Sequence, residues 1–311
     1  MSLATTQPDS VTVLLSTYNG HRYLKQQLDS LYGQTYANLR ILVRDDGSSD
    51  ATINMLEVEQ AKGTIDLLTE RKNLGPALSF FTLLKQASIT DTALVAFCDQ
   101  DDVWQPEKIT RAVAALQGVS AHHPAMYCCR IEMVDEQLNR VAMGEVPRKI
   151  GFGNALVENI ATGCTIVLNR AAIDLLSAGV PDNAQMHDWW CYLVMSCFGE
   201  VIFDPVALIK YRLHDHNTIG VATKFTARFA RKLHRFFGKQ KQKAWCSDHA
   251  YALREIYGDK IPIQNKQLVD RFIAAKSSFF PRVGLVFSGD LWRQKFDDNF
   301  FLRILLLINK I

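Results

Sequence analysis

The chain has 311 residues, of which 48% are hydrophobic and 22% are charged, with 17 Gly and 9 Pro. These proportions are those of a folded globular protein, and they exclude a disordered, a collagen-like or a polytopic membrane chain. The formal net charge is only +3, so the chain as a whole lacks the strong positive charge of a typical nucleic-acid-binding protein.

Strand-like and helix-like segments alternate over the first 116 residues. Short apolar runs at 11–15, 39–43, 65–68 and 93–98 are typical of buried strands. Helical spacing follows each run, with Leu24, Leu28 and Leu31 on one face of the first helix. Further helices are expected at 52–62, with Asp50 as its N-cap, at 77–87, and from Pro106 to about residue 116. Four such repeats predict an α/β fold with a mostly parallel central sheet and helices on both faces.

Beyond residue 120 the pattern is mixed. Strands are expected at 126–134, 165–168, 201–203 and 207–213, and an amphipathic helix at 188–198. From about residue 222 the sequence becomes helical and basic. We therefore divide the chain into an α/β domain at 1–222 and a basic, helical C-terminal region at 223–311.

The cysteines and the N-terminus indicate the compartment. Seven Cys are present, and no C-x-x-C pair suggests a zinc ribbon or a disulfide framework. Buried free thiols in a reducing compartment are the simplest interpretation. The N-terminal segment MSLATTQPDS has neither the basic nor the apolar part of a signal peptide, and no run reaches the length of a membrane span. We expect a cytoplasmic protein.

Polar clusters follow three of the four predicted strands: TYN at 17–19, DDGSSD at 45–50 and DQDD at 99–102. In a parallel sheet these strand ends face one crevice, where ligands bind. Two Asp at a D-x-D spacing offer oxygen ligands to Mg²⁺ or Mn²⁺. The alternative is a solvated loop before a helix. The DDGSSD run and Asn73 also suit ordinary turns.

Two later segments carry titratable groups. Asp188 lies beside His187 and two Trp residues, and such surroundings favour a general base with a raised pKa. The alternative is a helix N-cap at Asp188. His214, Asp215 and His216 follow a predicted strand and suggest a metal or diphosphate contact. The absence of G-x-G-x-x-G, of a P-loop and of G-x-S-x-G argues against a dinucleotide-binding, an NTPase and an α/β-hydrolase site.

The ordered set TYN, DDGSSD, NLG, DQDDVWQPEKI, HDWW and YRLHDHNTIG resembles the family-2 glycosyltransferases of GT-A fold. Within that family it is most similar to the bacterial rhamnosyltransferase-like branch. The resemblance covers roughly residues 10–220.

The resemblance implies a role for each matching residue. Asp188 would be the catalytic base, and Asp101, Asp102 and His214 would hold the metal. Asp46 would bond the pyrimidine N3–H, and Asp99 would bond the ribose or assist the metal. The donor and acceptor pocket would include Gly163, Cys164, Trp189 and Asn217. The nucleotide would contact Thr17, Tyr18, Asn19, Asp45, Asp46, Asn73, Asp99 and Gln100.

The implied activity is an inverting transfer of a sugar from a nucleotide-diphosphate donor, with Mg²⁺ or Mn²⁺ as cofactor. The branch favours dTDP-rhamnose as donor, with a dTDP- or UDP-sugar as the wider class. The acceptor would be a glycan or a lipid-linked glycan in O-antigen or capsule synthesis. Two alternatives remain: a metal-dependent phosphohydrolase that uses the same Asp residues, and a non-catalytic nucleotide-sugar-binding scaffold.

A basic segment lies at 223–243, with eight Lys or Arg and no acidic residue. Phe225, Phe229 and Leu233 recur there at helical spacing. Such a segment favours peripheral contact with the inner face of the plasma membrane. The alternative is a helix that packs on the core with a solvated basic face. No RNA-binding motif accompanies it, so no nucleic-acid partner is expected.

Overall fold

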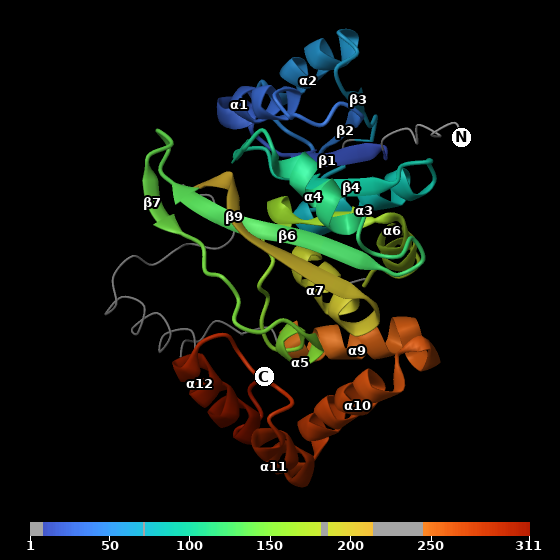
Figure 1. Cartoon of the computed structure of the whole chain (residues 1–311), viewed down its shortest axis with the longest axis vertical. Coiled ribbons are helices and arrows are strands. Elements are labelled where there is room, and N and C mark those ends of the chain that lie inside the picture. The colour runs from blue at the N-terminus through green and yellow to red at the C-terminus, as the bar shows by residue number, and fades with distance from the viewer. Residues whose placement is uncertain (1–8, 71, 182–185, 214–244) are drawn as a thin grey trace, which may run out of the picture.

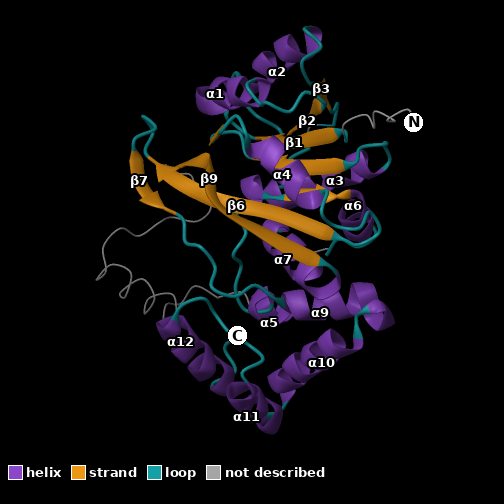
Figure 2. Ribbon diagram, viewed as in Figure 1, coloured by secondary structure: helices purple, strands orange, loops and turns teal. Residues whose placement is uncertain are grey.

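The computed structural model describes residues 9–70, 72–181, 186–213 and 245–311. A nine-stranded sheet crosses the middle of the molecule, in the order β3-β2-β1-β4-β8-β6-β9-β5, with β7 paired to β6 (Figures 1 and 2). The strands are β1 Val11–Thr17, β2 Leu39–Asp45, β3 Asp66–Leu67, β4 Leu94–Cys98, β5 Val103–Trp104, β6 Ala125–Val134, β7 Arg140–Met143, β8 Val167–Asn169 and β9 Glu200–Arg212.

The helices cover both faces and one end of this sheet (Figure 2). They are α1 His21–Tyr32, α2 Thr52–Ala61, α3 Pro76–Ser88, α4 Lys108–Leu116, α5 Phe152–Ala155, α6 Arg170–Ser177, α7 His187–Phe198, α9 Trp245–Tyr257, α10 Ile263–Ser277, α11 Phe279–Ser288 and α12 Phe296–Leu307. Short 3-10 turns occupy Gly163–Thr165 and Gly258–Lys260.

The expected α/β fold with a C-terminal helical extension is confirmed. The strands β3, β2, β1 and β4 are parallel to one another, and β6 is parallel to β9, whereas β8 runs antiparallel to both β4 and β6. The sheet is therefore mixed beyond β4, in agreement with the mixed sequence pattern after residue 120. Two expected strands at 201–203 and 207–213 are one strand, β9, with a bulge opposite Cys129 and Arg130. Pro205 lies at this bulge, where it has no ladder hydrogen bond to donate.

Strand alternation divides the core into two halves. One half packs under α1, α2 and α4 and includes Val13, Leu15 and Val43. The other half packs under α3, α6 and α7 and includes Leu14 and Phe97. This second half continues without a break into Leu253, Phe272 and Leu302 of the C-terminal helices, which therefore share the core of the sheet.

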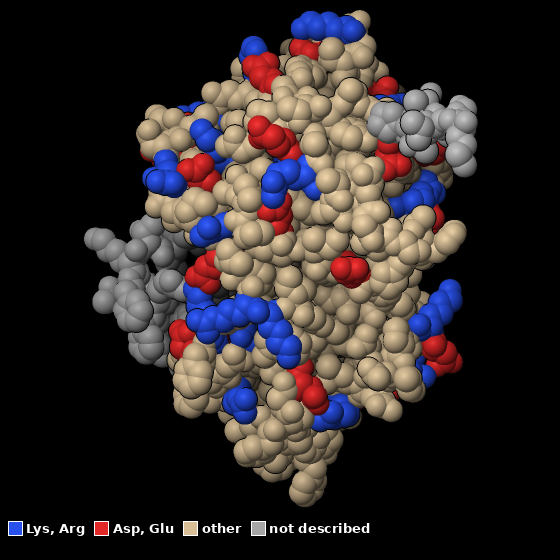
Figure 3. Space-filling model, viewed as in Figure 1, with Lys and Arg blue, Asp and Glu red and all other residues tan. Residues whose placement is uncertain are grey.

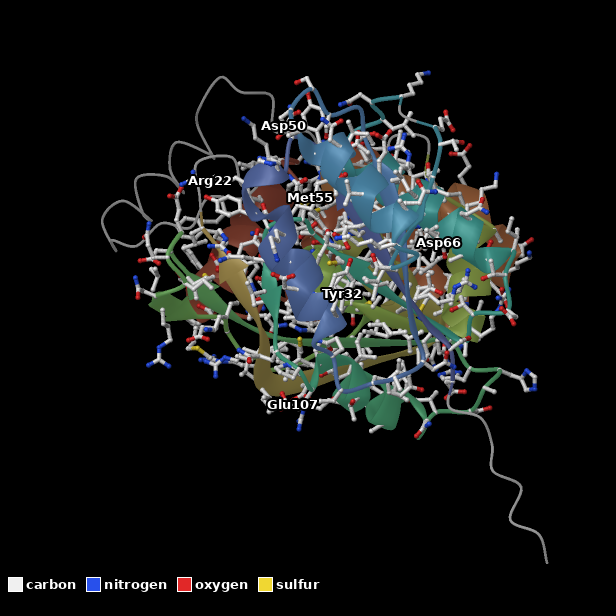
Figure 4. The ribbon with its side chains drawn as sticks, turned by 90° about the horizontal axis from the view of Figure 1, so that it is seen from above. Arg22, Tyr32, Asp50, Met55, Asp66 and Glu107 are labelled. Atoms are coloured by element: carbon white, nitrogen blue, oxygen red, sulfur yellow. The ribbon has the colours of Figure 1, made fainter. Side chains whose placement is uncertain are left out.

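Seen from above, α1 and α2 lie side by side at the β3 end of the molecule (Figure 4). Tyr32 of α1 donates a hydrogen bond of 2.9 Å to Glu59 of α2. The helix α2 begins at Thr52, as expected, but its cap position is Ala51 and not the expected Asp50. Asp50 nevertheless accepts the Thr52 N–H at 2.9 Å and the His21 N–H at 3.2 Å. One carboxylate thus fixes the starts of both helices.

Candidate active site

The loop after β1 is connected to the end of β4 by a reciprocal pair of hydrogen bonds. The Tyr18 N–H donates to Gln100 Oε1 at 2.8 Å, and Gln100 Nε2 donates to the Tyr18 carbonyl at 3.0 Å. A Cβ at Gly20 would lie 2.0 Å from the same Gln100 oxygen. The pair therefore needs glycine at position 20, and it leaves the Tyr18 ring half exposed at the crevice.

The same loop is joined to the end of β2. Asn19 has a left-handed backbone with φ 49°, and its side-chain oxygen accepts the Ser49 N–H at 2.8 Å. The buried Asp45 carboxylate accepts Thr17 Oγ1 at 2.9 Å, together with the backbone N–H groups of Gly47 and Ser48. The predicted nucleotide residues of β1 and β2 thus form one hydrogen-bonded unit.

Asp46 forms a buried ion pair with Arg44, whose side chain is fully buried. The two carboxylate oxygens of Asp46 also accept the N–H groups of Leu74 at 2.7 Å and Gly75 at 2.8 Å. These bonds position the loop that carries Asn73, whose side chain is exposed. Three donors occupy three of the four lone-pair positions of the carboxylate. Arg44 was not identified from the sequence, because an Arg inside an apolar strand gives no motif.

An acidic cluster lies after β4. Asp99, Asp102 and Cys164 place potential ligand atoms within 4.8 Å of one another. Burial and the charges of Asp101 and Asp188 raise the pKa of Asp99 to about 7. Burial and the charges of Asp101 and Asp99 also raise the pKa of Asp102. Negative charges kept this close out of water are unfavourable unless a cation or a proton compensates them.

The donor set of this cluster suits a hard divalent cation in part. Asp102 Oδ2 is buried and has no hydrogen-bond partner among the described residues. Carboxylate oxygens are the ligands that Mg²⁺ and Mn²⁺ prefer, whereas the Cys164 thiol is a soft ligand that they do not. The carboxylates of Asp99 and Asp102, with Asp101 beside them, therefore fit such an ion, and Cys164 fits a role in packing.

Arg212, at the end of β9, holds the acidic cluster from the other side. Its backbone N–H donates to Asp102 Oδ1 at 3.2 Å, and its Nε donates to the Asp101 carbonyl at 2.9 Å. The guanidinium lies 4.4 Å from the centre of the Tyr23 ring. Sequence analysis missed this residue, although it lies within the YRLHDHNTIG segment, two residues before His214.

Lys108 is a second buried cation that the sequence did not reveal. Its Nζ lies 3.2 Å from the centre of the Trp104 ring and has no hydrogen-bond partner in the described ranges. Burial lowers the pKa of Lys108 to about 8, against opposing effects that include the nearby charge of Asp102. Its positive charge lies beneath the acidic cluster and offsets part of the repulsion there.

Asp188 is the second residue of α7, and the start of this helix directs it toward the acidic cluster. Its Oδ1 accepts the Trp189 N–H at 2.7 Å. Burial raises the pKa of Asp188 to about 6, although hydrogen bonds from Trp189 and from the Asn159 side chain lower it. The helix cap is Met186, so Asp188 is not the N-cap that the alternative interpretation required.

The residues around Asp188 are closely packed. The His187 ring lies between Phe80 and Phe97, with ring centres 4.1 and 5.0 Å away. A Cβ at Gly163 would lie 2.6 Å from His187 Nε2, so this turn also needs glycine. Trp189 is buried and donates its indole N–H to the Ala155 carbonyl at 2.7 Å. This hydrogen bond joins the start of α7 to α5.

Two clefts lie near Asp188, on the side of the C-terminal helices. The nearer one, of about 190 Å³, is lined by Asn159, Thr162 and Gln294 among others. It shares Arg130 and Glu145 with a larger cleft of about 540 Å³, which extends to Lys295 and Phe296. Asn159, whose side chain bonds Asp188, lines the nearer cleft, and the larger cleft reaches the start of α12.

The structure thus brings most of the predicted site residues to one edge of the sheet. Asp99, Asp101, Asp102, Cys164 and Asp188 meet there from β4, the turn before β8 and α7. Asp45 and Asp46 lie at the neighbouring strand ends, but their carboxylates are engaged by protein donors. His214, Asn217 and the basic segment at 223–243 lie outside the described residues. All seven Cys are buried and free, as expected.

A sheet of this topology, with helices on both faces and a C-terminal helical extension, is the GT-A fold. Two solved structures support the fold. *S. aureus* TarS residues 1–349 align over 97% of this chain and 81% of that one, with a TM-score of 0.56 and 16% identity. A mannosyltransferase from *Pyrobaculum calidifontis*, in complex with GDP-Man and Mn²⁺, aligns over 98% and 88% with a TM-score of 0.50 and 17% identity.

Residues 12–171 match the family described as glycosyl transferase family 2, and the chain belongs to this family. A dTDP-rhamnosyl transferase from *Shigella flexneri*, RfbG, is 23% identical over 95% of this chain and 99% of its own length. *Escherichia coli* WfgD, a UDP-Glc:alpha-D-GlcNAc-diphosphoundecaprenol beta-1,3-glucosyltransferase, is 32% identical over 58% of this chain and 68% of its own length. No helix in the described ranges combines the length and hydropathy needed to span a membrane.

Proposed function

We propose that this chain transfers a sugar, with inversion, from a nucleotide-diphosphate donor to a lipid-linked or free glycan acceptor in cell-surface polysaccharide synthesis. The observation that carries this proposal is the placement of Asp188. It faces Asp99 closely enough for its charge to raise the pKa of that carboxyl. The proposed base and the proposed cation site are therefore neighbours, and the reacting sugar would lie between them.

Asp188 is proposed to act as the general base. Its carboxylate removes the proton of the acceptor hydroxyl, and the resulting oxygen forms a bond to the anomeric carbon. The bond from that carbon to the diphosphate oxygen breaks on the opposite face, and the nucleoside diphosphate leaves with the electron pair. Burial keeps the pKa of Asp188 at about 6, near the pH at which a base is both deprotonated and effective.

The proposed metal ligands are Asp101 and Asp102, with Asp99 beside them and His214 as a further candidate. Mg²⁺ or Mn²⁺ bound there would neutralise the negative charge that develops on the leaving diphosphate. Arg212 holds Asp101 and Asp102 in place through its backbone and side chain. Asn19, Gln100 and Asn73, with Thr17, Tyr18, Asp45 and Asp46, would surround the nucleoside.

The relatives support a donor and an acceptor class. The rhamnosyl transferase name of RfbG, which aligns over nearly the whole chain, favours dTDP-rhamnose as donor. The name of WfgD specifies a sugar on diphosphoundecaprenol, which favours a lipid-linked acceptor. The two clefts beside Asp188 are the proposed acceptor site, with Gly163 and Cys164 bordering the donor sugar.

The first test is a transfer assay with dTDP-rhamnose and a panel of UDP- and GDP-sugars. The acceptor is a sugar diphosphate on a short lipid, and products are identified by mass spectrometry. Asp188→Asn should reduce transfer by about 10²–10⁴-fold, the usual contribution of a general base. Asp259→Asn is the matched control, because Asp259 lies on the surface in an ion pair with Lys266. Transfer by Asp188→Asn at the wild-type rate would refute the role of Asp188.

The second test is thermal unfolding with dTDP, UDP, GDP or CDP, each with Mn²⁺ or with EDTA. A ligand at about 100-fold its Kd stabilises the folded state by about 2.7 kcal/mol. We expect this stabilisation with dTDP only in the presence of the metal, and we expect Asp188→Asn to retain it. Phosphate release from simple esters without an acceptor would favour the phosphohydrolase, and nucleotide binding without any turnover would favour the scaffold.

A further inference from the structure

The helices α11 and α12 expose an unusual number of large apolar side chains. The described part of the chain exposes seventeen such residues, and eight of them lie between positions 279 and 308. All five exposed Phe side chains in these ranges belong to this group. We call it the apolar end face, and it consists of Phe279, Phe280, Phe287, Phe296, Phe300, Ile304, Leu307 and Ile308.

Helix α12 is apolar on two opposite sides. Leu302, Leu305 and Leu306 face inward and are buried in the core. Phe296, Phe300, Ile304 and Leu307, at spacings of four, four and three, form a second stripe that points away from the core. Phe296 is 86% exposed. A helix that is apolar all round is normally buried, so this second stripe indicates that something covers it in the working protein.

Helix α11 extends the same surface. Phe280 is 83% exposed and Phe287 is 79% exposed, whereas Leu285 and Val286 of the same helix are buried. Two arginines fix α11 and α12 to each other. Arg282 donates to the Leu307 carbonyl at 3.4 Å, and Arg303 donates to the Val286 carbonyl at 2.7 Å. The apolar end face is therefore a surface held by two connected helices, at the end of the molecule opposite α1 and α2 (Figure 1).

The charge around this surface indicates the kind of partner. From residue 276 to the C-terminus the chain has six Lys or Arg and three Asp or Glu. Figure 3 shows few charged side chains at the end of the molecule where α11 lies, and a band of Lys and Arg next to it. Exposed aromatic and aliphatic side chains with basic residues at their border are the features of a helix that lies in the interface of an anionic bilayer.

The apolar end face adjoins the larger of the two clefts. Phe296, part of this face, also lines the larger cleft together with Lys295 and Arg148. A sugar linked through a diphosphate to a lipid would need its charged head in that cleft and its apolar chain outside. Phe296 belongs to both the cleft lining and the apolar end face. A bilayer docked at this face would therefore keep the acyl chain of the acceptor while the charged head enters the cleft.

We propose that the apolar end face docks on an anionic lipid bilayer and places the mouth of the clefts at the membrane surface. The docking itself stands on α11 and α12, and only its use for a lipid-linked acceptor rests on the proposed function. Both helices would lie flat in the interface. The Lys and Arg residues next to the apolar end face would face anionic lipid headgroups. The exposed Phe side chains would enter the outer part of the acyl layer.

The test is cosedimentation of the full chain with vesicles of phosphatidylcholine alone or mixed with phosphatidylglycerol. Wild type should bind the anionic vesicles, and Phe280→Ser/Phe287→Ser/Phe300→Ser should bind at least tenfold more weakly. The matched control is Ile89→Ser. Ile89 is 75% exposed, but it lies at the end of α3 and is not part of the apolar end face. Thermal unfolding of each variant verifies that it is folded.

Three results would overturn the proposal. The triple variant could bind vesicles as well as wild type, which would assign docking to another segment such as 223–243. Wild type could ignore anionic vesicles altogether. Light scattering could instead show a wild-type dimer that the triple variant loses, which would make the face an interface between copies.

The activity assay separates this proposal from the proposed function. On a water-soluble, short-chain acceptor the triple variant should transfer sugar at the wild-type rate, whereas on acceptor embedded in vesicles it should be at least tenfold slower. If wild type transfers no sugar to any acceptor but binds anionic vesicles, the proposed function fails and the docking stands.

Discussion

At the ends of β1 and β2, the buried carboxylates of Asp45 and Asp46 accept hydrogen bonds from hydroxyl, backbone and guanidinium donors. At the end of β4, the equally buried Asp102 is bonded only by the Arg212 N–H at 3.2 Å and the Cys164 thiol, and its Oδ2 has no partner among the described residues. The two regions lie at neighbouring strand ends of one sheet, but their charges are compensated very differently.

This difference distinguishes carboxylates that hold the fold together from carboxylates that are available to bind a ligand. Buried polar groups in folded proteins are normally satisfied, because an unsatisfied one costs about 1–3 kcal/mol. Asp45 and Asp46 follow this rule and hold two loops in place. Asp102 does not, because its Oδ2 has no partner among the described residues. Burial together with the neighbouring carboxylates raises the pKa values of both Asp99 and Asp102. A protein keeps such a cluster only where a ligand completes it, which is the role that we propose for a divalent cation.

The largest expected effect comes from breaking the satisfied region. Asp46→Ala leaves the fully buried Arg44 without its carboxylate, and loss of one partner of a buried pair costs about 3–5 kcal/mol. Urea unfolding measures this loss. Asp66→Ala is the control, because Asp66 pairs with Arg40 at the surface, where such a pair contributes less than about 1 kcal/mol. Equal losses in the two variants would contradict the comparison.

The next effect concerns a buried group that is kept neutral. His249 of α9 lies 5.0 Å from the centre of the Trp189 ring, and burial lowers the pKa of His249 to about 4. In the unfolded chain His249 takes up a proton near pH 6.5, whereas in the folded chain it stays neutral until the pH approaches 4. Protonation therefore favours the unfolded state, and the folded state loses stability as the pH falls from 6.5 toward 4. At pH 5 the loss amounts to about 2 kcal/mol.

His249→Phe should remove this acid sensitivity. The measurement is the free energy of unfolding of wild type and variant at pH 7 and pH 5. The exposed His122 supplies the control, and His122→Phe should behave as wild type. Parallel pH dependences of wild type and His249→Phe would show that folding does not lower the pKa of His249.

The smallest effect has the opposite sign. Asp102→Asn should stabilise the metal-free protein at pH 8, because it removes a buried carboxyl group whose pKa is raised by burial and by the charges of Asp101 and Asp99. A raised pKa means that the folded chain retains a proton which the unfolded chain loses near pH 4. Wild type in EDTA therefore loses stability as the pH rises from 4 through the raised pKa of Asp102, and the variant should not.

The measurement is urea unfolding in EDTA at pH 5 and pH 8, repeated with Mn²⁺. The metal should stabilise wild type and have little effect on Asp102→Asn. A destabilised Asp102→Asn at pH 8 in EDTA would place Asp102 with Asp45 and Asp46 as a structural carboxylate.

Much of this protein followed from local sequence. The apolar runs that end in TYN, DDGSSD and DQDD predicted the strands β1, β2 and β4 and the crevice at their ends, because side chains at the carboxyl ends of parallel strands must meet. The HDWW segment indicated Asp188 as a possible general base, and the resemblance to family-2 glycosyltransferases implied the same role; in the structure its charge acts on Asp99. Short elements were missed: β5 has two residues and β7 has four, too few for a periodic pattern.

The tertiary structure alone decided what each charged side chain contacts. Nothing local distinguishes the paired Asp46 from the unpaired Asp102, since both follow apolar strands and both have acidic neighbours. Arg44, Lys108 and Arg212 are buried by contacts between elements far apart in the chain, and a strand pattern does not anticipate a buried cation.

The same holds for the C-terminal helices, whose sequence specifies apolar residues on several sides. Only packing shows that Leu302 and Leu306 enter the core while Phe296 and Phe300 stay outside. The sequence by itself determined the secondary structure and the order of the polar loops, because periodicity and strand ends are local properties. Compensation of buried charge, and which apolar stripe of α12 remains uncovered, depend on neighbours from distant segments, so only the folded structure could decide them.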